Sequence, residues 1–206
     1  MNRRPRLFVV AAPSGAGKST LVNALLAREP GLRLSVSHTT RLIRPNEKDG
    51  REYYFIPVAD FQALAQRGMF LEHARVFDNF YGTSKQQLED KLAAGFDVIL
   101  EIDWQGARQV RAAIPDCVTI FILPPSRAAL ETRLRNRKTD SDAVIARRLG
   151  DSVSDMSHCR EFDYIVVKDD FERAVGDLQF LLRGGPKAVD LRAGRPDLAP
   201  LLRDLV

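Results

Sequence analysis

The fold of this 206-residue chain is constrained most strongly by several short, continuous runs of apolar, often β-branched residues. A strand with one solvated face would alternate apolar and polar side chains, so continuous runs indicate strands that are covered on both faces. Such strands are typical of a parallel sheet. The predicted strands lie at residues 7–12, 97–102, 117–123 and 163–167.

Segments with helical spacing separate these runs. The predicted helices lie at residues 18–28, 84–94, 127–135, 142–156 and 171–182. Ser84 and Gln87 match a capping box at the start of the second helix, and Gly95 is placed to end it. The alternation of strands and helices predicts an α/β fold, a three-layer sandwich with a central parallel sheet.

Two regions break this alternation. Residues 34–77 contain short extended pieces and one short helix near residues 60–66, which indicates a small inserted subdomain. Residues 136–141 form an irregular stretch between two helices that carry arginines.

The tail at residues 184–206 is rich in glycine, proline and charge, and it ends in leucines with helical spacing. These leucines could dock on the body of the protein or on a partner subunit of a homo-oligomer, or the tail could form a frayed end.

Composition narrows the class of protein. Hydrophobic residues make up 45% of the chain and charged residues 28%, as in ordinary globular proteins. We expect no membrane partner, because no apolar run could span a bilayer, and we read no signal peptide at the N-terminus. The chain contains two cysteines and shows no disulfide framework or metal cluster, which favours the cytoplasm.

The net charge of +4 suits an enzyme of anionic metabolites as well as a nucleic-acid binder. Aromatic side chains are not interleaved with the basic ones, so we expect no nucleic-acid partner.

A glycine-rich segment between the first strand and the first helix is close to the phosphate-loop pattern G-x-x-x-x-G-K-[ST]. Gly17, Lys18 and Ser19 match, whereas Ala12 replaces the first glycine. In such a loop backbone N–H groups at a helix N-terminus hold phosphates, the lysine bridges the β- and γ-phosphates, and the hydroxyl binds Mg²⁺. The residues predicted to contact the phosphates of a bound nucleoside triphosphate are Ala12, Pro13, Ser14, Gly15, Ala16, Gly17, Lys18, Ser19 and Thr20.

Arginines and tyrosines gather in the predicted insert. Arg41 and Arg44 lie three residues apart, with Tyr53 and Tyr54 nearby. Forked arginine donors and phenol hydroxyls could hold a second phosphate, although a solvated basic loop would look the same.

The pattern S-x-x-T-R-x-x-R-P-x-E-x-x-G-x-x-Y-x-F over residues 37–55 resembles the guanylate kinase family. Further segments that resemble it lie at residues 70–72, 81–84, 101–106, 120–126, 145–149, 163–164 and 169–170, so the likeness runs from residue 7 to about 182. It implies one kinase domain at residues 1–183, with a core at 1–33 and 84–183, a GMP-binding insert at 34–83 and a mobile lid at about 127–157.

The resemblance also implies the reaction, which is transfer of the γ-phosphoryl group of MgATP to GMP, with dGMP as a second acceptor. Arg41, Arg44, Tyr53 and Tyr81 would hold the GMP phosphate. Ser37, Glu72 and Thr83 would read the guanine, with Asp103 near the base or the metal waters and Glu101 beside it. Arg133, Arg137 and Arg148 would reach ATP, and the catalytic charges would be Lys18, Arg41, Arg137, Arg148 and Mg²⁺ held by Ser19.

Guanine chemistry supports Glu72 in this role. Guanine presents N1–H and an exocyclic amine on one edge, and a carboxylate can accept from both. Adenine lacks that N1–H, so a pocket of this kind can discriminate by roughly 10⁴-fold. Without the family pattern, Glu72 would be interpreted as an exposed strand carboxylate.

Glu101 and Asp103 are two residues apart at a predicted strand end, so they would share one face. That arrangement suits a site beside a metal ion, with a solvated strand end as the alternative.

Phosphoryl transfer requires alignment and positive charge more than a general base, so we assign none. Arginines that arrive only when both substrates are bound would protect ATP from water, which predicts closure of the insert and of residues 136–141.

Four residues depart from the family pattern. Asn46, Asn136 and Lys138 stand where glycines are common, and Lys168 replaces an asparagine implicated in adenine recognition. Lysine cannot accept a hydrogen bond from the adenine amine, so our hypothesis is a relaxed preference for ATP. Two other readings stay open, a non-catalytic guanylate-kinase-like binding module and a nucleoside monophosphate kinase with another acceptor.

Overall fold

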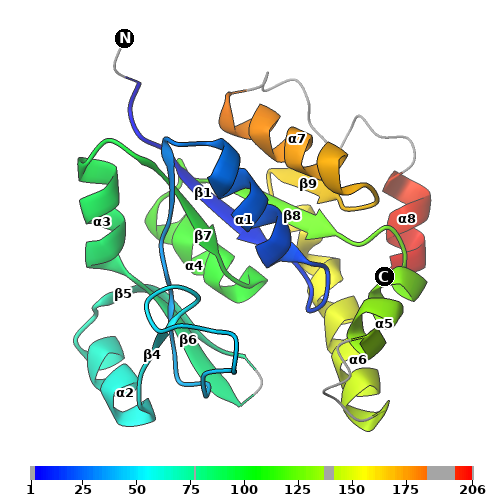
Figure 1. Ribbon diagram of the computed structural model, residues 1–206, viewed down its shortest axis with the longest axis horizontal. Helices are drawn as coiled ribbons and strands as arrows, with labels where there is room; N and C mark the ends of the chain where they lie inside the picture. The colour runs from blue at the N-terminus through cyan, green and yellow to red at the C-terminus, as the bar shows by residue number, and fades with distance from the viewer. Residues whose placement is uncertain (1–2, 77, 137–141, 185–197, 206) are drawn as a thin grey trace. The chain divides into compact units, whose positions relative to one another are not determined.

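The computed structural model describes residues 3–76, 78–136, 142–184 and 198–205 (Figure 1). The helices are α1 (Lys18–Arg28), α2 (Val58–Gln66), α3 (Lys85–Ala93), α4 (Trp104–Ala113), α5 (Arg127–Asn136), α6 (Asp142–Ser157), α7 (Phe171–Leu182) and α8 (Leu198–Leu205), with a short 3₁₀-helix η1 (His158–Glu161). The strands are β1 (Leu7–Ala11), β2 (Leu32–Leu34), β3 (His38–Thr39), β4 (Tyr54–Phe55), β5 (Phe70–Val76), β6 (Asn79–Ser84), β7 (Asp97–Glu101), β8 (Val118–Leu123) and β9 (Tyr164–Val167).

The strands form two sheets. One has the order β2-β7-β1-β8-β9, and its β2–β7 and β8–β9 pairs are parallel. The other has the order β4-β3-β6-β5, in which β3 pairs parallel with β4, while β6 pairs antiparallel with β3 and β5. Parallel pairing of buried apolar strands is what the continuous apolar runs predict.

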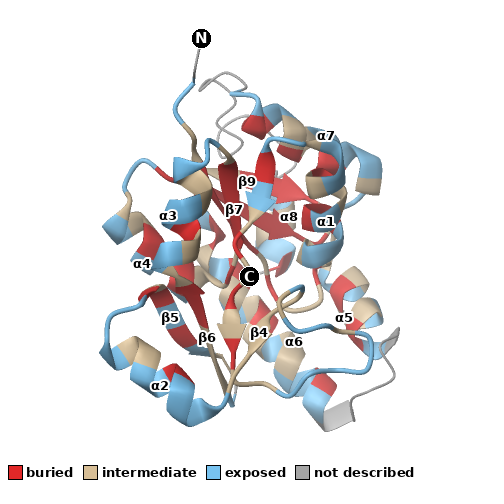
Figure 2. Ribbon diagram, turned by 60° about the vertical axis from the view of Figure 1, so that its left-hand side comes forward, coloured by how far each residue is buried: buried red, intermediate tan, exposed pale blue. Residues whose placement is uncertain are grey.

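The chain divides into two compact units, one made of Met1–Val9 and Pro30–Val118 and the other of Val10–Glu29 and Thr119–Val206. In the first unit Val98, Ile99 and Leu100 of β7 are fully buried (Figure 2), and α3 packs against this strand. The adjoining Asp97 accepts a hydrogen bond from the backbone N–H of Arg6 at 2.7 Å and pairs with Arg3. These contacts fix the N-terminal strand beside β7.

The four-stranded sheet of the first unit is built around the β5–β6 hairpin. Phe61 of α2 is buried and stacks on Phe70 of β5 and Phe80 of β6, at centroid distances of 4.6 and 5.5 Å. Helix α4 packs against β5. An irregularity in the β5–β6 pairing between Phe70 and Glu72 changes the register at the residue predicted to read guanine.

In the second unit, α1 packs against α7, α7 against β9, and α5 against α6. The starts of β8 and β9 are joined by Asp163, whose carboxylate accepts from the backbone N–H and the hydroxyl of Thr119, at 2.9 and 2.8 Å. The backbone N–H of Asp163 donates back to the Thr119 hydroxyl at 3.0 Å. This exchange of hydrogen bonds holds the two parallel strands in register.

Helix α1 and helix α7 have the predicted bounds, and the other predicted elements of the core agree to within about two residues, as is usual for helix and strand ends. Ser84 accepts from the backbone N–H of Gln87 at 3.4 Å, which confirms the N-cap half of the predicted capping box. Gly95 follows α3 with a positive φ of 87°, which confirms the predicted end of the helix. Within the described residues, no helix combines the length and the apolar character needed to cross a membrane.

Helix α4 was not predicted, and its presence corrects one argument about Asp103. Strand β7 ends at Glu101, and Asp103 is the N-cap of α4, where its side chain accepts from the backbone N–H of Gly106 at 2.8 Å. The two-residue alternation of a strand therefore does not extend from Glu101 to Asp103. Aspartate at this position begins a helix because its carboxylate satisfies an otherwise unpaired N–H.

Candidate functional site

The phosphate loop connects β1 to α1 through two glycines with left-handed backbone angles. Gly15 has φ 86° and Gly17 has φ 84°, a conformation that residues with a Cβ rarely adopt. The N–H of Ala16 donates a hydrogen bond to the carbonyl of Pro13 at 3.2 Å, which closes a turn over residues 13–16. Gly17 is the N-cap of α1, so Lys18 and Ser19 begin the helix, as the pattern predicts.

Side chains from the same unit donate hydrogen bonds to three carbonyls of this loop. Arg133 donates to the carbonyl of Ala16 at 3.0 Å, Lys168 to that of Gly17 at 3.2 Å, and Ser152 to that of Ser14 at 3.2 Å. In a planar trans peptide the N–H points opposite to the C=O. These bonds therefore hold the N–H groups of the following residues, among them Gly17 and Lys18, in the opposite direction, where an anion could bind.

The ammonium group of Lys168 lies in the space that a side chain at Gly17 would occupy. A Cβ on Gly17 would lie 2.2 Å from the Lys168 ammonium nitrogen. Burial and the neighbouring charge of Arg133 lower the pKa of Lys168. Arg133 also donates to the Lys168 carbonyl, at 3.4 Å. Lys168, one of the four residues that depart from the family pattern, thus lies against the phosphate loop.

A buried carboxylate lies at the centre of the predicted guanine pocket in the first unit. Glu72 of β5 is only 3% exposed, and its Oε1 accepts from the hydroxyl of Thr83 at 2.6 Å. Thr83 is the residue opposite Glu72 on β6 and is fully buried. Because Thr83 uses its single proton on Glu72, the buried Ser37, 3.4 Å away, is placed to donate to Thr83. The structure brings these three predicted residues together, and Glu72 is not the exposed carboxylate that its local sequence suggests.

The N-terminus of α4 closes around Glu72. A Cβ built on the buried Gly106 would lie 2.6 Å from Glu72 Oε2 and 3.3 Å from Oδ1 of Asp103. The amide of Gln109 pairs with the backbone of His73, accepting at 3.1 Å and donating at 2.9 Å. Helix α4 is thereby fixed to the edge strand that carries Glu72.

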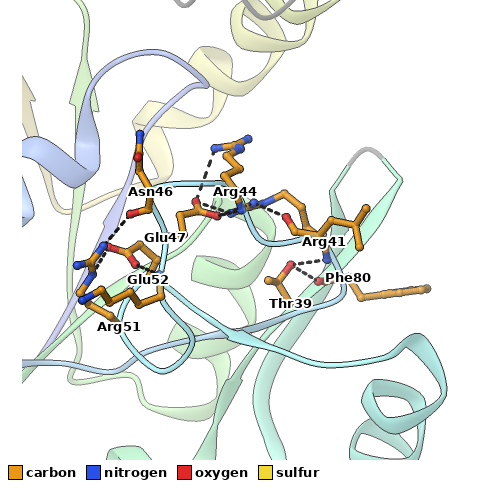
Figure 3. A network of polar contacts seen from close by, with 10 residues as sticks. Thr39, Arg41, Arg44, Asn46, Glu47, Arg51, Glu52 and Phe80 are labelled. Carbon is orange, nitrogen blue, oxygen red and sulfur yellow. Dashed lines mark hydrogen bonds and ion pairs between the residues drawn. The ribbon is translucent and has the colours of Figure 1, made fainter.

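The loop at residues 41–47, called the arginine loop below, holds the guanidinium of Arg41 in a forked ion pair (Figure 3). Arg41 donates from Nη1 and Nη2 to the two oxygens of Glu47 at 2.9 and 2.8 Å, and Glu47 also accepts from the backbone N–H of Arg44 at 2.9 Å. Burial by itself would raise the pKa of Glu47, but the hydrogen bonds from Arg41 and Arg44 and the charges of both arginines together outweigh burial and lower that pKa. For Arg41, burial opposes the charged form, yet the bonds to Glu47 leave its pKa raised.

The predicted tyrosines lie beside this arginine. The guanidinium of Arg41 is 5.4 Å from the ring centre of Tyr53, and the rings of Tyr53 and Tyr81 meet edge to face at 5.7 Å. Burial, followed by the charges of Glu101 and Tyr81, raises the pKa of Tyr53, so its phenol is a donor at neutral pH. Arg41, Tyr53 and Tyr81 thus form one group of donors.

The remaining predicted residues are spread over both units. Arg44 is exposed beside Glu47, and Arg148 is half-buried on α6. Ser19 and Thr20 are exposed at the start of α1. Arg137 and Lys138 lie outside the described residues, as do residues 139–141 of the predicted lid.

Sequence reasoning assigned no role to Glu47, Gly106, Gln109 or Ser152, which the structure places around the candidate site. Glu47 carried a usable signal, because an acidic residue next to two predicted phosphate-binding arginines needs a reason. Gly106 carried a weaker signal. A glycine three residues after an N-cap lowers the helix propensity of the first turn, so its presence there needs a reason.

Comparisons with known proteins identify the family of the chain. The family model "Guanylate kinase" matches residues 4–184. A guanylate kinase of Methylococcus capsulatus is 53% identical over 200 residues, which are 97% of either chain. One of Nitrosococcus oceani is 58% identical over 177 residues, covering 86% of this chain and 87% of that relative.

Among solved structures, the crystal structure of guanylate kinase from Anaplasma phagocytophilum matches with a TM-score of 0.73. That match has 34% sequence identity and covers 97% of this chain and 94% of the other, in agreement with the predicted α/β fold. The chain belongs to the guanylate kinase family.

Proposed function

We propose that this protein is an ATP:GMP phosphotransferase, which moves the γ-phosphoryl group of MgATP to GMP and releases ADP and GDP. The observation that carries this proposal is the buried Glu72 carboxylate, fixed by Thr83, in a chain of the guanylate kinase family. We include dGMP as a second acceptor and place the reaction in purine nucleotide metabolism and GMP recycling in the cytoplasm.

The base would be read by Glu72, Thr83 and Ser37, with Asp103 nearby. A buried carboxylate costs free energy unless it accepts hydrogen bonds. Guanine supplies two donors on one edge, whereas adenine supplies none at N1. A bound adenine would therefore offer the Glu72 carboxylate no donor at N1, which is the physical basis of discrimination.

The acceptor phosphate would be held by Arg41, Arg44, Tyr53 and Tyr81. Glu47 fixes the plane of the Arg41 guanidinium before GMP binds, so less side-chain freedom is lost on binding. The hydroxyl of Tyr53, whose pKa is raised by burial, is protonated at neutral pH and could donate a hydrogen bond to the GMP phosphate. We assign GMP to residues 34–83.

The donor phosphates would bind the N–H groups of residues 12–20, with Lys18 on the β- and γ-phosphates. The hydroxyl of Ser19, exposed at the start of α1, is an oxygen donor of the kind that Mg²⁺ prefers. Bound Mg²⁺ would neutralise charge on the phosphates. Arg133, Arg137 and Arg148, from the region that we assign as a lid at about 127–157, would complete the positive environment.

Catalysis would come from alignment and charge. The transferring phosphoryl group passes through a loose transition state with charge spread over its oxygens, so Lys18, Arg41, Arg137 and Arg148 would stabilise it without a general base.

The test is ADP formation from MgATP with GMP, AMP, CMP or UMP supplied singly. We expect strong turnover with GMP alone, and a loss of roughly 10²-fold or more in Lys18→Ala, which lacks a transition-state charge. Turnover with another monophosphate would indicate another acceptor. Binding of GMP without turnover by the wild-type protein would instead support a non-catalytic binding module.

A further inference from the structure

One glycine of α4 leaves room for the Glu72 carboxylate. Gly106 is buried in the first turn of the helix, and its N–H donates to Asp103 at 2.8 Å. A Cβ at this position would lie 2.6 Å from Glu72 Oε2 and 3.1 Å from its carboxyl carbon, closer than non-bonded atoms normally approach. With the carboxylate in this position, a side chain at residue 106 would have to displace it.

We infer that Gly106 is a specificity-determining positioning residue, whose missing side chain sets where the Glu72 carboxylate meets the purine. This inference rests on the proposed function, because it assumes that Glu72 reads the base. Gly106 itself need not touch the nucleotide and would act through Glu72.

The helix would resist displacement by a methyl group at residue 106. Its first turn is capped by Asp103, and Gln109 makes two hydrogen bonds to the backbone of His73 on β5, the strand that carries Glu72. The more movable partner is the end of the Glu72 side chain. Alanine would therefore rotate or push the carboxylate, straining its 2.6 Å bond to Thr83 and changing the direction of its lone pairs.

Folding and purine recognition should respond differently to this change. Alanine favours a helix more than glycine does, so Gly106→Ala adds helix propensity while it misplaces the carboxylate. A matched control exists in Gly176, which is also within a helix but has no atom within 4 Å of a built Cβ. Gly176→Ala changes propensity alone.

The experiment measures the dissociation constants of GMP and IMP, together with KM for GMP and ATP and the melting temperature. IMP keeps N1–H but lacks the exocyclic amine, so it reports on the second hydrogen bond to the carboxylate. In Gly106→Ala we expect GMP affinity to fall about 10-fold or more, the range of one lost hydrogen bond to a charged group, and the GMP-to-IMP preference to shrink. KM for ATP should match that of Gly176→Ala, while the melting temperature reports how much stability the strained bond to Thr83 costs.

A double-mutant cycle with Glu72→Asp shows whether Gly106→Ala weakens GMP binding through the Glu72 carboxylate or through a general defect in the protein. Aspartate is shorter by one methylene and would vacate the space beside residue 106. Adding Gly106→Ala to Glu72→Asp should then change GMP affinity by less than about 3-fold, so the two effects would not add.

Three results would overturn the inference. Gly106→Ala could weaken GMP binding equally in the wild-type and Glu72→Asp backgrounds, or it could leave the GMP-to-IMP preference unchanged. Gly176→Ala could also weaken GMP binding as much as Gly106→Ala does. If the wild-type protein itself fails to prefer GMP over IMP, the proposed function fails and the role of Gly106 falls with it. A wild-type preference that Gly106→Ala leaves intact refutes only the role of Gly106.

Discussion

At the scale of single residues, two carboxylates of the first unit organise their surroundings in different ways. Glu72 is buried and bound by the hydroxyl of Thr83, whereas Glu47 holds a forked pair with Arg41 in the loop that follows β3. Family resemblance predicted a role for Glu72, but its burial depends on partners from β6 and α4 that no local pattern identifies. The role of Glu47 emerged only from the geometry.

Glu47→Gln should weaken both the arginine loop and GMP binding. The glutamine keeps the size of the side chain but loses the charge that orients Arg41. We expect KM for GMP to rise several-fold with kcat less affected, and the free energy of unfolding to fall by about 1 kcal/mol at neutral pH. Steady-state kinetics and urea denaturation measure the two effects.

The stability effect of Glu47 should depend on pH in one direction. The pKa of Glu47 is lowered in the folded protein, so its ion pair stabilises above the unfolded value of about 4.3 and is lost as pH falls through the folded pKa. The difference between wild type and Glu47→Gln should be constant above roughly pH 5 and shrink below that. A difference that grows on acidification would contradict this assignment.

At the scale of elements, β1, β7, β8, β9 and most core helices follow from the sequence, while the short parallel strand β2 and helix α4 do not. The buried strands read clearly because continuous apolar runs leave few alternatives. Helix α4 escaped prediction because Gly106 in its first turn lowers helix propensity, and because Asp103 was interpreted as part of a strand end. At residue 106 the close approach of the helix backbone to the Glu72 carboxylate outweighs the low helix propensity of glycine.

The junction of β8 and β9 offers a test of element pairing. Asp163→Ala would remove the acceptor for the N–H and the hydroxyl of the buried Thr119, and we expect a loss of about 2–3 kcal/mol in the free energy of unfolding. Asp163→Asn retains one acceptor oxygen and should lose about half as much. Urea denaturation would contradict this account if Asp163→Ala stayed within roughly 0.5 kcal/mol of wild type.

The segment after β9 tests the choice of phosphoryl donor. Lys168 lies against Gly17, and we propose that it relaxes the preference for ATP because it cannot accept from the adenine amine. Lys168→Asn should raise the ratio of kcat/KM for ATP over GTP by about 10-fold, the value of one good hydrogen bond. Lys85→Asn, on the exposed start of α3, serves as the control. Unchanged ratios for GTP and ITP would reject this role.

At the scale of the whole molecule, the residues predicted for the two nucleotides belong to different compact units. The phosphate loop and the side chains that donate to its carbonyls lie in the unit that contains Val10–Glu29, and the residues proposed to read guanine lie in the unit that contains Pro30–Val118. Sequence motifs located both sets of residues because each motif is local. The contacts that orient them, such as Arg133 on Ala16 or Gln109 on His73, join segments far apart in the chain and required the structure.

The most direct test of the central claim compares kcat/KM for GMP and AMP in the wild-type protein and in Glu72→Gln. The account predicts that wild type prefers GMP by roughly 10⁴-fold. In Glu72→Gln the amide can no longer accept from both guanine donors, so activity with GMP should fall by about 10²-fold or more while activity with AMP changes little. A wild-type enzyme that phosphorylates AMP as readily as GMP, or a variant that keeps the full preference, would contradict it.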